Sequence, residues 1–217
     1  MSERKVQLAL GEYFHVYNRG NSKQKVFFDT RDYKRFMTLL YVSNSVESFK
    51  LHLINDPYAD FERGEQLVSI GAYCLMPNHF HLLLTPLQEN GISQFMKKVS
   101  TGYVMYFNKK YERTGALFEG KYKAQHATSD EYLKYLFSYI HLNPVKLMQS
   151  DWKESGIHDR EAALAYLEKY KHSSFQDYDS VERIESAILN KEKFPEYFPT
   201  KERFRREIFD WMNFTAE

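Results

Sequence analysis

Two histidines separated by one residue, His79 and His81, have the spacing in this sequence that most directly suggests chemistry. They stand in the run PNHFHLLL (77–84), which is apolar enough to form a strand. Successive side chains of a strand point to opposite faces of a sheet, so both imidazoles should lie on one face and the apolar residues on the other. Two adjacent imidazoles could bind one metal ion. Paired histidines can also sit on a half-exposed sheet face without any ligand, and the spacing alone leaves that alternative open.

A second candidate set lies in the segment YIHLNPVK (139–146). If this segment ends a helix, Tyr139 and Asn143 are one turn apart on the same face, and His141 points elsewhere. The amide oxygen of Asn143 could then complete a His/His/Asn metal site, and the same face would bring Tyr139 to the metal. The structural alternatives are ordinary ones, because asparagine before proline commonly ends a helix and a stripe of tyrosines can simply be core.

The chemistry suited to such a set is phosphoryl transfer to tyrosine. A phenol, with an unperturbed pKa near ~10, is a poor nucleophile at neutral pH. It becomes useful when a metal polarises a phosphodiester and holds the phosphorus in line with the phenolic oxygen. Two imidazoles and an amide oxygen leave coordination positions for phosphate oxygens and water, which suits Mg²⁺ or Mn²⁺. A closed zinc site is not expected, since there is no HExxH motif and one cysteine cannot form a thiolate cluster.

The elements that must position these residues follow from hydrophobic periodicity and turn signals. Strands are expected at 12–18, 67–76, 79–85 and 121–127, and helices at 30–45, 91–111, 129–143, 160–170 and 201–213. Gly115 and Gly120 are expected to bracket a short strand pair, of which 121–127 is the second member. This order predicts an α+β domain with a mainly antiparallel sheet covered by helices, followed by a helical C-terminal extension.

Composition narrows the class of protein. The 217-residue chain is 43% hydrophobic and 17% aromatic, which excludes disorder of the low-hydrophobicity kind. Its single cysteine, Cys74, excludes a disulfide-built secreted fold and indicates a reducing compartment. The N-terminus has no signal-peptide core and no apolar run approaches a membrane span, so we expect a cytoplasmic protein without membrane association.

The distribution of charge is more informative than the net charge of +1. Residues 97–126 carry seven basic and two acidic side chains, interleaved with aromatic residues. Cations beside rings are typical of a groove for single-stranded nucleic acid, although solvated helix and hairpin faces with core aromatics between them would give the same pattern. Residues 150–217 carry 11 basic and 15 acidic side chains, which argues against a second DNA-binding domain.

Three segments of the sequence resemble the REP-associated tyrosine transposases, which belong to the single-tyrosine HUH transposase superfamily. These segments are YFHVYNRG (13–20), YCLMPNHFH (73–81) and YIHLNPV (139–145). The segment GALFEGKYKAQHA (115–127) is also similar to the hairpin that precedes the tyrosine helix in that family. The resemblance covers roughly residues 11–148, with a weaker similarity at 170–178. Three matching blocks in the right order are much more specific than an isolated HxH pair.

The resemblance implies a ferredoxin-like HUH domain over residues 1–150 that nicks and rejoins single-stranded DNA. Residues 151–217 would be a mostly helical extension packed on it. By the family pattern, His79 and His81 would be metal ligands, Tyr139 the nucleophile that forms a 5′-phosphotyrosine link, and Asn143 the third ligand. Some superfamily members carry glutamine at this last position. Because family members typically act beside small DNA hairpins, single-stranded or hairpin DNA is the expected partner of this chain. The protein itself could act either as a monomer or as a homodimer.

Charge and proximity to the motifs suggest four DNA contacts, which are Arg19, Arg113, Lys121 and Lys123.

Two other functions stay open at this point. The first is a non-catalytic module that holds single-stranded nucleic acid on its sheet and aromatic side chains. The second is a metal-dependent hydrolytic nuclease in which water attacks the phosphodiester and Tyr139 only packs in the core.

Overall fold

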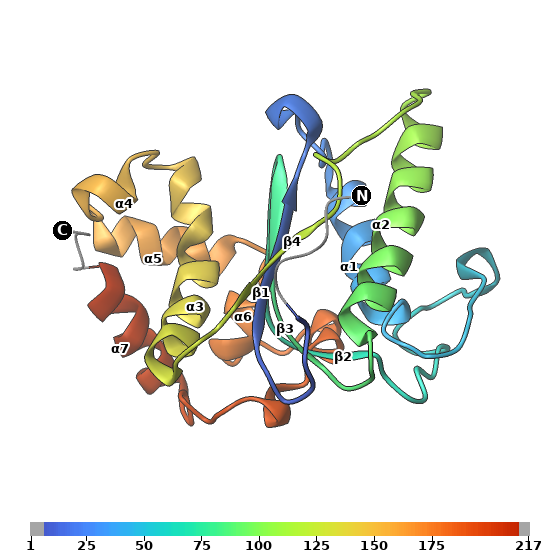
Figure 1. Ribbon diagram of the computed structural model, residues 1–217. Coiled ribbons are helices and arrows are strands. Elements are labelled where there is room, and N and C mark those ends of the chain that lie inside the picture. Colours follow the sequence, from blue (N-terminus) through green and yellow to red (C-terminus); the bar gives the residue numbers. More distant parts are fainter. Residues whose placement is uncertain (1–6, 213–217) are drawn as a thin grey trace.

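A four-stranded antiparallel sheet forms the centre of the molecule, as the computed structural model of residues 7–212 shows (Figure 1). Its strands are β1 (Phe14–Arg19), β2 (Val68–Met76), β3 (His79–Pro86) and β4 (Lys123–His126), in the spatial order β2-β3-β1-β4. Two interleaved β-α-β units give this order. The expected α+β, ferredoxin-like antiparallel sheet covered by helices is therefore confirmed.

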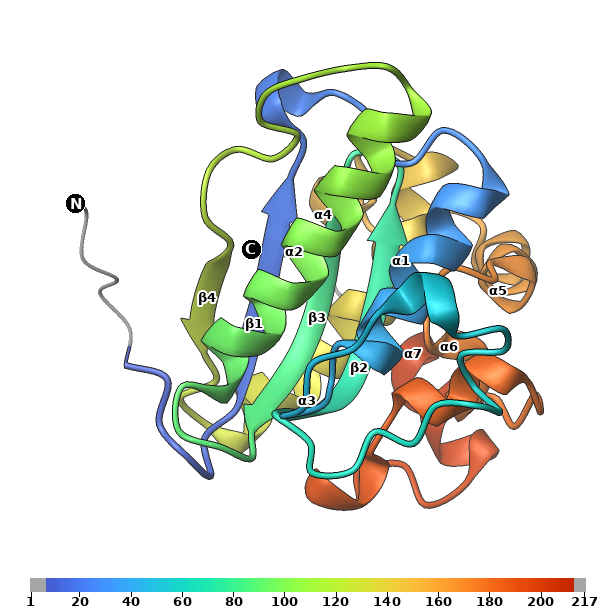
Figure 2. The same ribbon diagram turned by 90° about the vertical axis from the view of Figure 1, so that its right-hand side faces the viewer.

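Helices cover both faces of the sheet. The helices α1 (Thr30–Val42) and α2 (Gly91–Lys110) lie side by side on one face, the one turned to the viewer in Figure 2. On the other face lies α3 (Asp130–Leu142), which begins where the hydroxyl of Ser129 accepts a hydrogen bond from the backbone N–H of Tyr132. Beyond α3 follow α4 (Trp152–Ser155), α5 (Arg160–Lys169), α6 (Phe175–Tyr178) and α7 (Lys201–Met212). Within residues 7–212, no helix has the length and apolar character needed to cross a membrane.

Strand β3 alternates between the two faces. Phe80, Leu82 and Leu84 are buried in the core under α1 and α2. His79 and His81 lie on the opposite face, which α3 covers, and line a pocket there. The prediction that the two imidazoles share one face is confirmed.

The alternation of side chains along strand β2 shifts by one residue at a β-bulge, which the sequence pattern did not reveal. The register with β3 shifts between Ile70 and Ala72, so that Gly71 is the extra residue. Ile70 packs under α1 and α2, whereas Ala72 packs under α3. The ring of Phe194 lies on the bulge, and a Cβ atom at Gly71 would come within 2.7 Å of its Cζ. A larger residue at this position would therefore displace Phe194, through which the extension packs on the sheet.

The C-terminal extension packs on α3 and on the free edge of β2. Its apolar residues form a cluster with the end of α3, composed of Leu142, Val145, Trp152, Ile157, Ala163, Leu167, Phe175, Phe204, Ile208 and Met212. At the edge of β2, the backbone N–H of Leu75 donates to the backbone carbonyl of His172. The backbone N–H of Ser174 donates to the carbonyl of Tyr73. These contacts satisfy the backbone of an edge strand. The division of the chain at residue 150 stays a prediction.

The strand pair expected between residues 115 and 127 does not form. Only β4 is a strand in this segment, and it pairs with β1 instead of with a neighbour in a local hairpin. Phe118 makes a single isolated bridge with Gly20, while Gly115 and Gly120 turn the chain with φ values of 83° and 70°. Residues 115–122 are therefore a loop that runs beside the end of β1.

Candidate functional site

A pocket of about 410 Å³ opens between the sheet and α3, at the end of β1 and the start of β3. It is lined by Tyr17, Asn18, Arg19, Lys23, Asn78, His79, His81, Glu119, Lys123, Tyr139, Asn143, Lys146 and Lys153. The structure thus brings the two histidines, the tyrosine and the asparagine of the sequence motifs into one pocket. Their rings and amide come from β3 and from the end of α3, which face each other across the pocket.

The tautomer of His79 follows from its neighbour. Its Nδ1 lies 2.6 Å from the side-chain oxygen of Asn78, whose amide nitrogen donates to the carbonyl of Lys23. A carboxamide oxygen can only accept a hydrogen bond, so Nδ1 of His79 carries the proton. The lone pair of His79 is therefore on Nε2, the atom through which this ring could bind a metal.

His81 is bonded on one side of its ring only. Its Nδ1 lies 2.8 Å from Nε2 of His15, while its own Nε2 is buried and has no hydrogen-bond partner among the described residues. An unpartnered buried nitrogen is costly, and its presence is explained if a ligand binds there. Histidine ligands usually use their second ring nitrogen to bond a neighbour that orients them, as His15 would do here. The donor set therefore fits a metal bound through Nε2 of His81.

All three histidines of this cluster are neutral at physiological pH. Burial, with the nearby Lys146, lowers the pKa of His79 to about 4. Burial, with the nearby Lys153, likewise lowers the pKa of His15 to about 4. The pKa of His81 lies well below its ordinary value, because the ring is buried beside His15 and His79. Neutral imidazole is the form that binds metal ions.

Asn143 follows directly after α3, as expected for a residue before Pro144. Its buried side chain donates from Nδ2 to the carbonyl of Tyr139 over 2.8 Å. Since the amide nitrogen is used in this bond, the amide oxygen is the atom left for a ligand. Within residues 7–212, no group of three or more His, Cys, Asp or Glu side chains is placed to hold a metal ion. The pocket brings the asparagine and the two histidines together as candidate donors.

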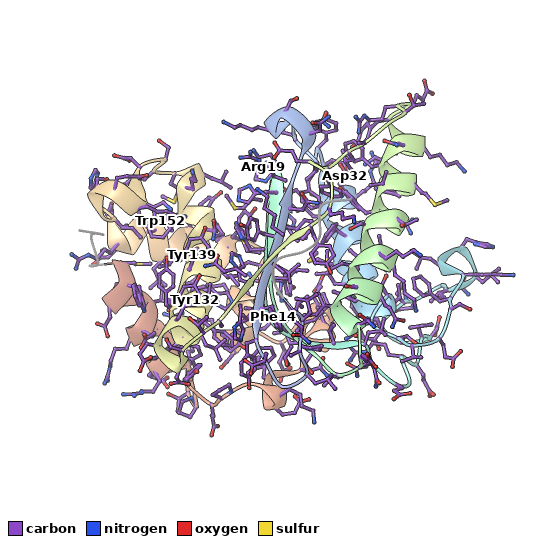
Figure 3. The ribbon with its side chains drawn as sticks, viewed as in Figure 1. Phe14, Arg19, Asp32, Tyr132, Tyr139 and Trp152 are labelled. Carbon is purple, nitrogen blue, oxygen red and sulfur yellow. The ribbon has the colours of Figure 1, made fainter. Side chains whose placement is uncertain are left out.

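The phenol of Tyr139 lies in the pocket and not in the core. Its ring is edge-on to His15 and His81, with centroid distances of 5.8 and 5.6 Å. Its oxygen accepts a hydrogen bond from Nζ of Lys153 over 2.9 Å. Figure 3 labels Tyr139 on α3, with Trp152 of the extension nearby. The tyrosine hydroxyl is therefore within reach of a substrate that enters the histidine pocket.

The pocket is rich in positive charge. Five basic side chains line it, from Arg19, Lys23, Lys123, Lys146 and Lys153, against the single carboxylate of Glu119. The carboxylate is paired with the guanidinium of Arg19. Such an excess of cations suits a phosphodiester backbone.

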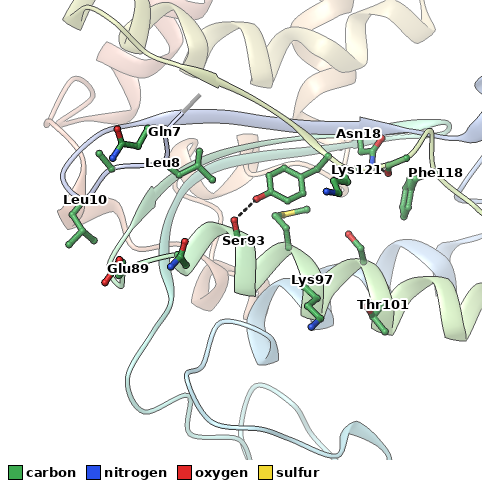
Figure 4. A pocket seen from close by; sticks show the side chains of 16 residues that line it. Gln7, Leu8, Leu10, Asn18, Glu89, Ser93, Lys97, Thr101, Phe118 and Lys121 are labelled. Carbon is green, nitrogen blue, oxygen red and sulfur yellow. Dashed lines mark hydrogen bonds between the residues drawn. The ribbon is translucent and has the colours of Figure 1, made fainter. Parts of the chain in front are cut away.

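The other two expected DNA contacts lie elsewhere. Lys121 lines a separate cavity of about 760 Å³ on the α2 side of the sheet, between α2, the N-terminal segment and the loop before β4 (Figure 4). Arg113 follows the end of α2, where it donates to the side chain of Asn108 and lies over the ring of Phe107. It lines neither the histidine pocket nor the cavity of Lys121.

Sequence reasoning assigned no role to His15 or to Lys153. His15 stands two residues before Tyr17, so its side chain shares a face with a pocket residue, but only the β1–β3 register reveals which ring it meets. Lys153 lies beyond the recognisable segments, and its sequence context carries no signal of a site.

Comparisons with known proteins agree with this arrangement. Residues 62–143 match the family model described as "Transposase IS200 like", a range that contains His79, His81, Tyr139 and Asn143. A solved structure described as a REP-associated tyrosine transposase bound to a REP hairpin aligns with a TM-score of 0.52 and 13% sequence identity. The alignment covers 85% of this chain and 90% of that chain, and at this identity it shows a shared fold. Among curated protein sequences, none matches this chain.

Proposed function

We propose, from the premise that this chain carries an IS200-like transposase domain, that it nicks and rejoins single-stranded DNA. Tyr139 would be the nucleophile, and His79, His81 and Asn143 would hold a divalent metal ion. One observation supports this proposal most: the unpartnered Nε2 of His81 and the hydroxyl of Tyr139 share a single, positively charged pocket.

The donor atoms define the role of the metal. The histidines would bind through their Nε2 atoms and Asn143 through its amide oxygen, a set that Mg²⁺ or Mn²⁺ can complete with phosphate oxygens and water. When bound, such an ion polarises the phosphodiester. His15 and Asn78 would hold the two imidazoles in the required orientation through their Nδ1 atoms.

The side chains of the pocket would carry out the transfer itself. Arg19, Lys123 and Lys146 would bind the phosphates on either side of the scissile one. The phenolic oxygen of Tyr139 would form a bond to phosphorus while the bond from phosphorus to the 3′ oxygen breaks. The products would be a 5′-phosphotyrosine and a strand with a free 3′ hydroxyl. A 3′ hydroxyl could then attack the same phosphorus and release the tyrosine, which rejoins DNA without loss of the phosphoester.

The proposed substrate is single-stranded DNA beside a hairpin. The structurally similar transposase is described as bound to a REP hairpin. The histidine pocket is lined by several cations and is only partly enclosed by α3 and the loop before β4, which is compatible with an extended strand. The same positive charge would also suit a module that holds DNA without cutting it, but such a module has no need of two imidazoles and a tyrosine hydroxyl in one pocket.

A panel of labelled hairpin oligonucleotides with single-stranded flanks tests the proposal. Each oligonucleotide is incubated with the protein and Mn²⁺, or with EDTA, and resolved on a denaturing gel. We expect a covalent protein–DNA band that requires Mn²⁺. Binding without any adduct would favour the non-catalytic module, and a free 5′ phosphate without an adduct would favour hydrolysis by water.

A further inference from the structure

Lys153 contacts the proposed nucleophile from outside the segment that matches the transposase family. It lies on α4, in the C-terminal extension, and its Nζ donates to the oxygen of Tyr139 over 2.9 Å. The ammonium also lies 4.1 Å from the centroid of the Tyr139 ring. It therefore approaches the oxygen from the face of the ring and not along the extension of the C–O bond.

The extension holds Lys153 in place by packing. The preceding residue, Trp152, is buried in the cluster that contains Leu142 and Val145 at the end of α3. The side chain of Gln149 closes the loop around α4 by donating to the carbonyl of Gly156 over 2.7 Å. The backbone of α4 is thus fixed against the helix that carries Tyr139, so the lysine is placed by the fold and not by chance contact of a long surface side chain.

We infer that Lys153 is a positioning residue that holds the Tyr139 oxygen and stabilises the negative charge that develops on it. This inference rests on the proposed function of Tyr139. Since the ammonium donates to one side of the oxygen, the phenolic proton is directed away from it. Tyr139 lines the histidine pocket, so its oxygen can be reached by a phosphorus atom bound there.

The positive charge of Lys153 would assist both cleavage and rejoining. In cleavage, the bond from the phenolic oxygen to phosphorus forms, the bond from phosphorus to the 3′ oxygen breaks, and the phenolic proton passes through water to the departing 3′ oxygen. In rejoining, a 3′ hydroxyl forms the bond to phosphorus, the phenolic oxygen leaves with the electron pair of its own bond to phosphorus, and the hydroxyl proton passes through water to the phenolic oxygen. Lys153 donates a hydrogen bond to the phenolic oxygen while that oxygen carries charge, as a preorganised donor does at a developing oxyanion.

Two other roles for the same ammonium predict different behaviour. If Lys153 only bound a DNA phosphate, its loss would weaken binding and leave the rate at saturating DNA unchanged. If it donated a proton to the departing 3′ oxygen, its loss would matter only when that leaving group needs a proton. A substrate with sulfur in place of the 3′ oxygen at the scissile bond removes this need, because a thiolate leaves without protonation.

The experiment compares adduct formation by the full-length protein and its Lys153→Met, Lys153→Arg and Lys146→Met variants. Rates are measured with Mn²⁺ and saturating DNA, using the oligonucleotide that the wild-type protein cleaves and its 3′-sulfur analogue. Lys146→Met is the matched control, since it removes one positive charge from the same pocket without a bond to Tyr139. Thermal unfolding and hairpin affinity are recorded for each variant.

We expect Lys153→Met to slow adduct formation roughly 10- to 100-fold with both substrates. Its melting temperature should be unchanged, and Lys153→Arg should recover most of the rate. Lys146→Met should instead raise the DNA concentration at half-saturation. A wild-type rate in Lys153→Met, a loss confined to affinity, or a loss confined to the 3′-oxygen substrate would each overturn the inference while leaving the proposed function intact. Absence of any adduct with the wild-type protein would overturn both.

Discussion

Nδ1 of His81 lies 2.8 Å from Nε2 of His15, and this contact joins two neighbouring antiparallel strands, β3 and β1. Tyr17 is the register partner of His81, so His15 is its diagonal neighbour on the same face of the sheet. If His81 binds a metal through Nε2, its Nδ1–H must donate to His15, which then accepts as a neutral ring. The pair therefore sets the orientation and the tautomer of the proposed ligand.

Replacing His15 with phenylalanine tests this role. The substitution keeps a ring of similar shape but removes the acceptor for His81, so we expect Mn²⁺ affinity to fall roughly 10- to 100-fold. The affinity can be measured from the electron paramagnetic resonance signal of free Mn²⁺ during a titration. His158→Phe is a matched control at an exposed position outside the pocket. Equal Mn²⁺ affinity in the wild-type protein and His15→Phe would show that His15 does not support a metal ligand.

Substitution of Asn143 separates its two roles. Asn143→Leu removes the proposed oxygen ligand together with the hydrogen bond to the Tyr139 carbonyl, and we expect at least a tenfold loss of Mn²⁺ affinity, about 1.4 kcal/mol. Asn143→Asp retains an oxygen donor and should bind Mn²⁺ more tightly than the leucine variant. Calorimetric titration measures both. If the two variants bound Mn²⁺ as the wild-type protein does, Asn143 would serve only to end the helix.

Local patterns predicted much of the fold. The two-residue alternation of β3 placed His79 and His81 on one face, and Pro144 placed the end of α3, because both effects depend on residues close in the chain. The pairing of β4 with β1 and the bulge at Gly71 depend on contacts between distant segments, so no local signal revealed them.

The candidate site also combines features that local sequence predicts with features that depend on contacts between distant segments. The predicted ligands and nucleophile lie in recognisable short segments, and their roles stay predictions. The contact of His15 with His81 depends on strand register, which spacing within one strand does not determine. Lys153 reaches Tyr139 only because Trp152 packs at the end of α3. DNA contacts at Arg113 and Lys121 are expected from charge and proximity in sequence alone, and these do not specify the face of the sheet on which a side chain lies.

The bulge at Gly71 gives a prediction about stability. A methyl group there would overlap the ring of Phe194, so we expect Gly71→Ala to lower the free energy of unfolding by about 1–3 kcal/mol. Denaturant unfolding provides the measurement. Gly102→Ala on α2 is the matched control, because its Cβ would meet only the flexible end of Leu39 and alanine favours the helix. A smaller loss at Gly71 than at Gly102 would contradict the packing described for the bulge.

His172 gives a prediction about pH. Its ring is stacked on Tyr33 with a centroid distance of 3.8 Å, and burial, with Arg183 nearby, lowers its pKa to about 4. Between pH 6.5 and 4 the unfolded chain binds a proton at this ring and the folded chain does not. The free energy of unfolding should therefore decrease as the pH falls through this window.

The variant His172→Phe keeps a stacked ring but cannot titrate. Its free energy of unfolding should fall less steeply than that of the wild-type protein, by up to about 1.4 kcal/mol per pH unit. The other buried histidines titrate in both proteins, so the difference between the two curves isolates His172. Parallel curves between pH 6.5 and 4 would show that this ring does not change its proton binding on folding.

The site of covalent attachment tests the central claim most directly. The Mn²⁺-dependent adduct is digested with nuclease and protease, and mass spectrometry locates the nucleotide on the peptide that contains α3. We predict a 5′-phosphotyrosine on Tyr139, loss of the adduct in Tyr139→Phe with hairpin binding largely retained, and persistence of the adduct in Tyr135→Phe. An adduct that survives Tyr139→Phe, or that maps to Tyr135 or Tyr132, would contradict the assignment of Tyr139 as the nucleophile.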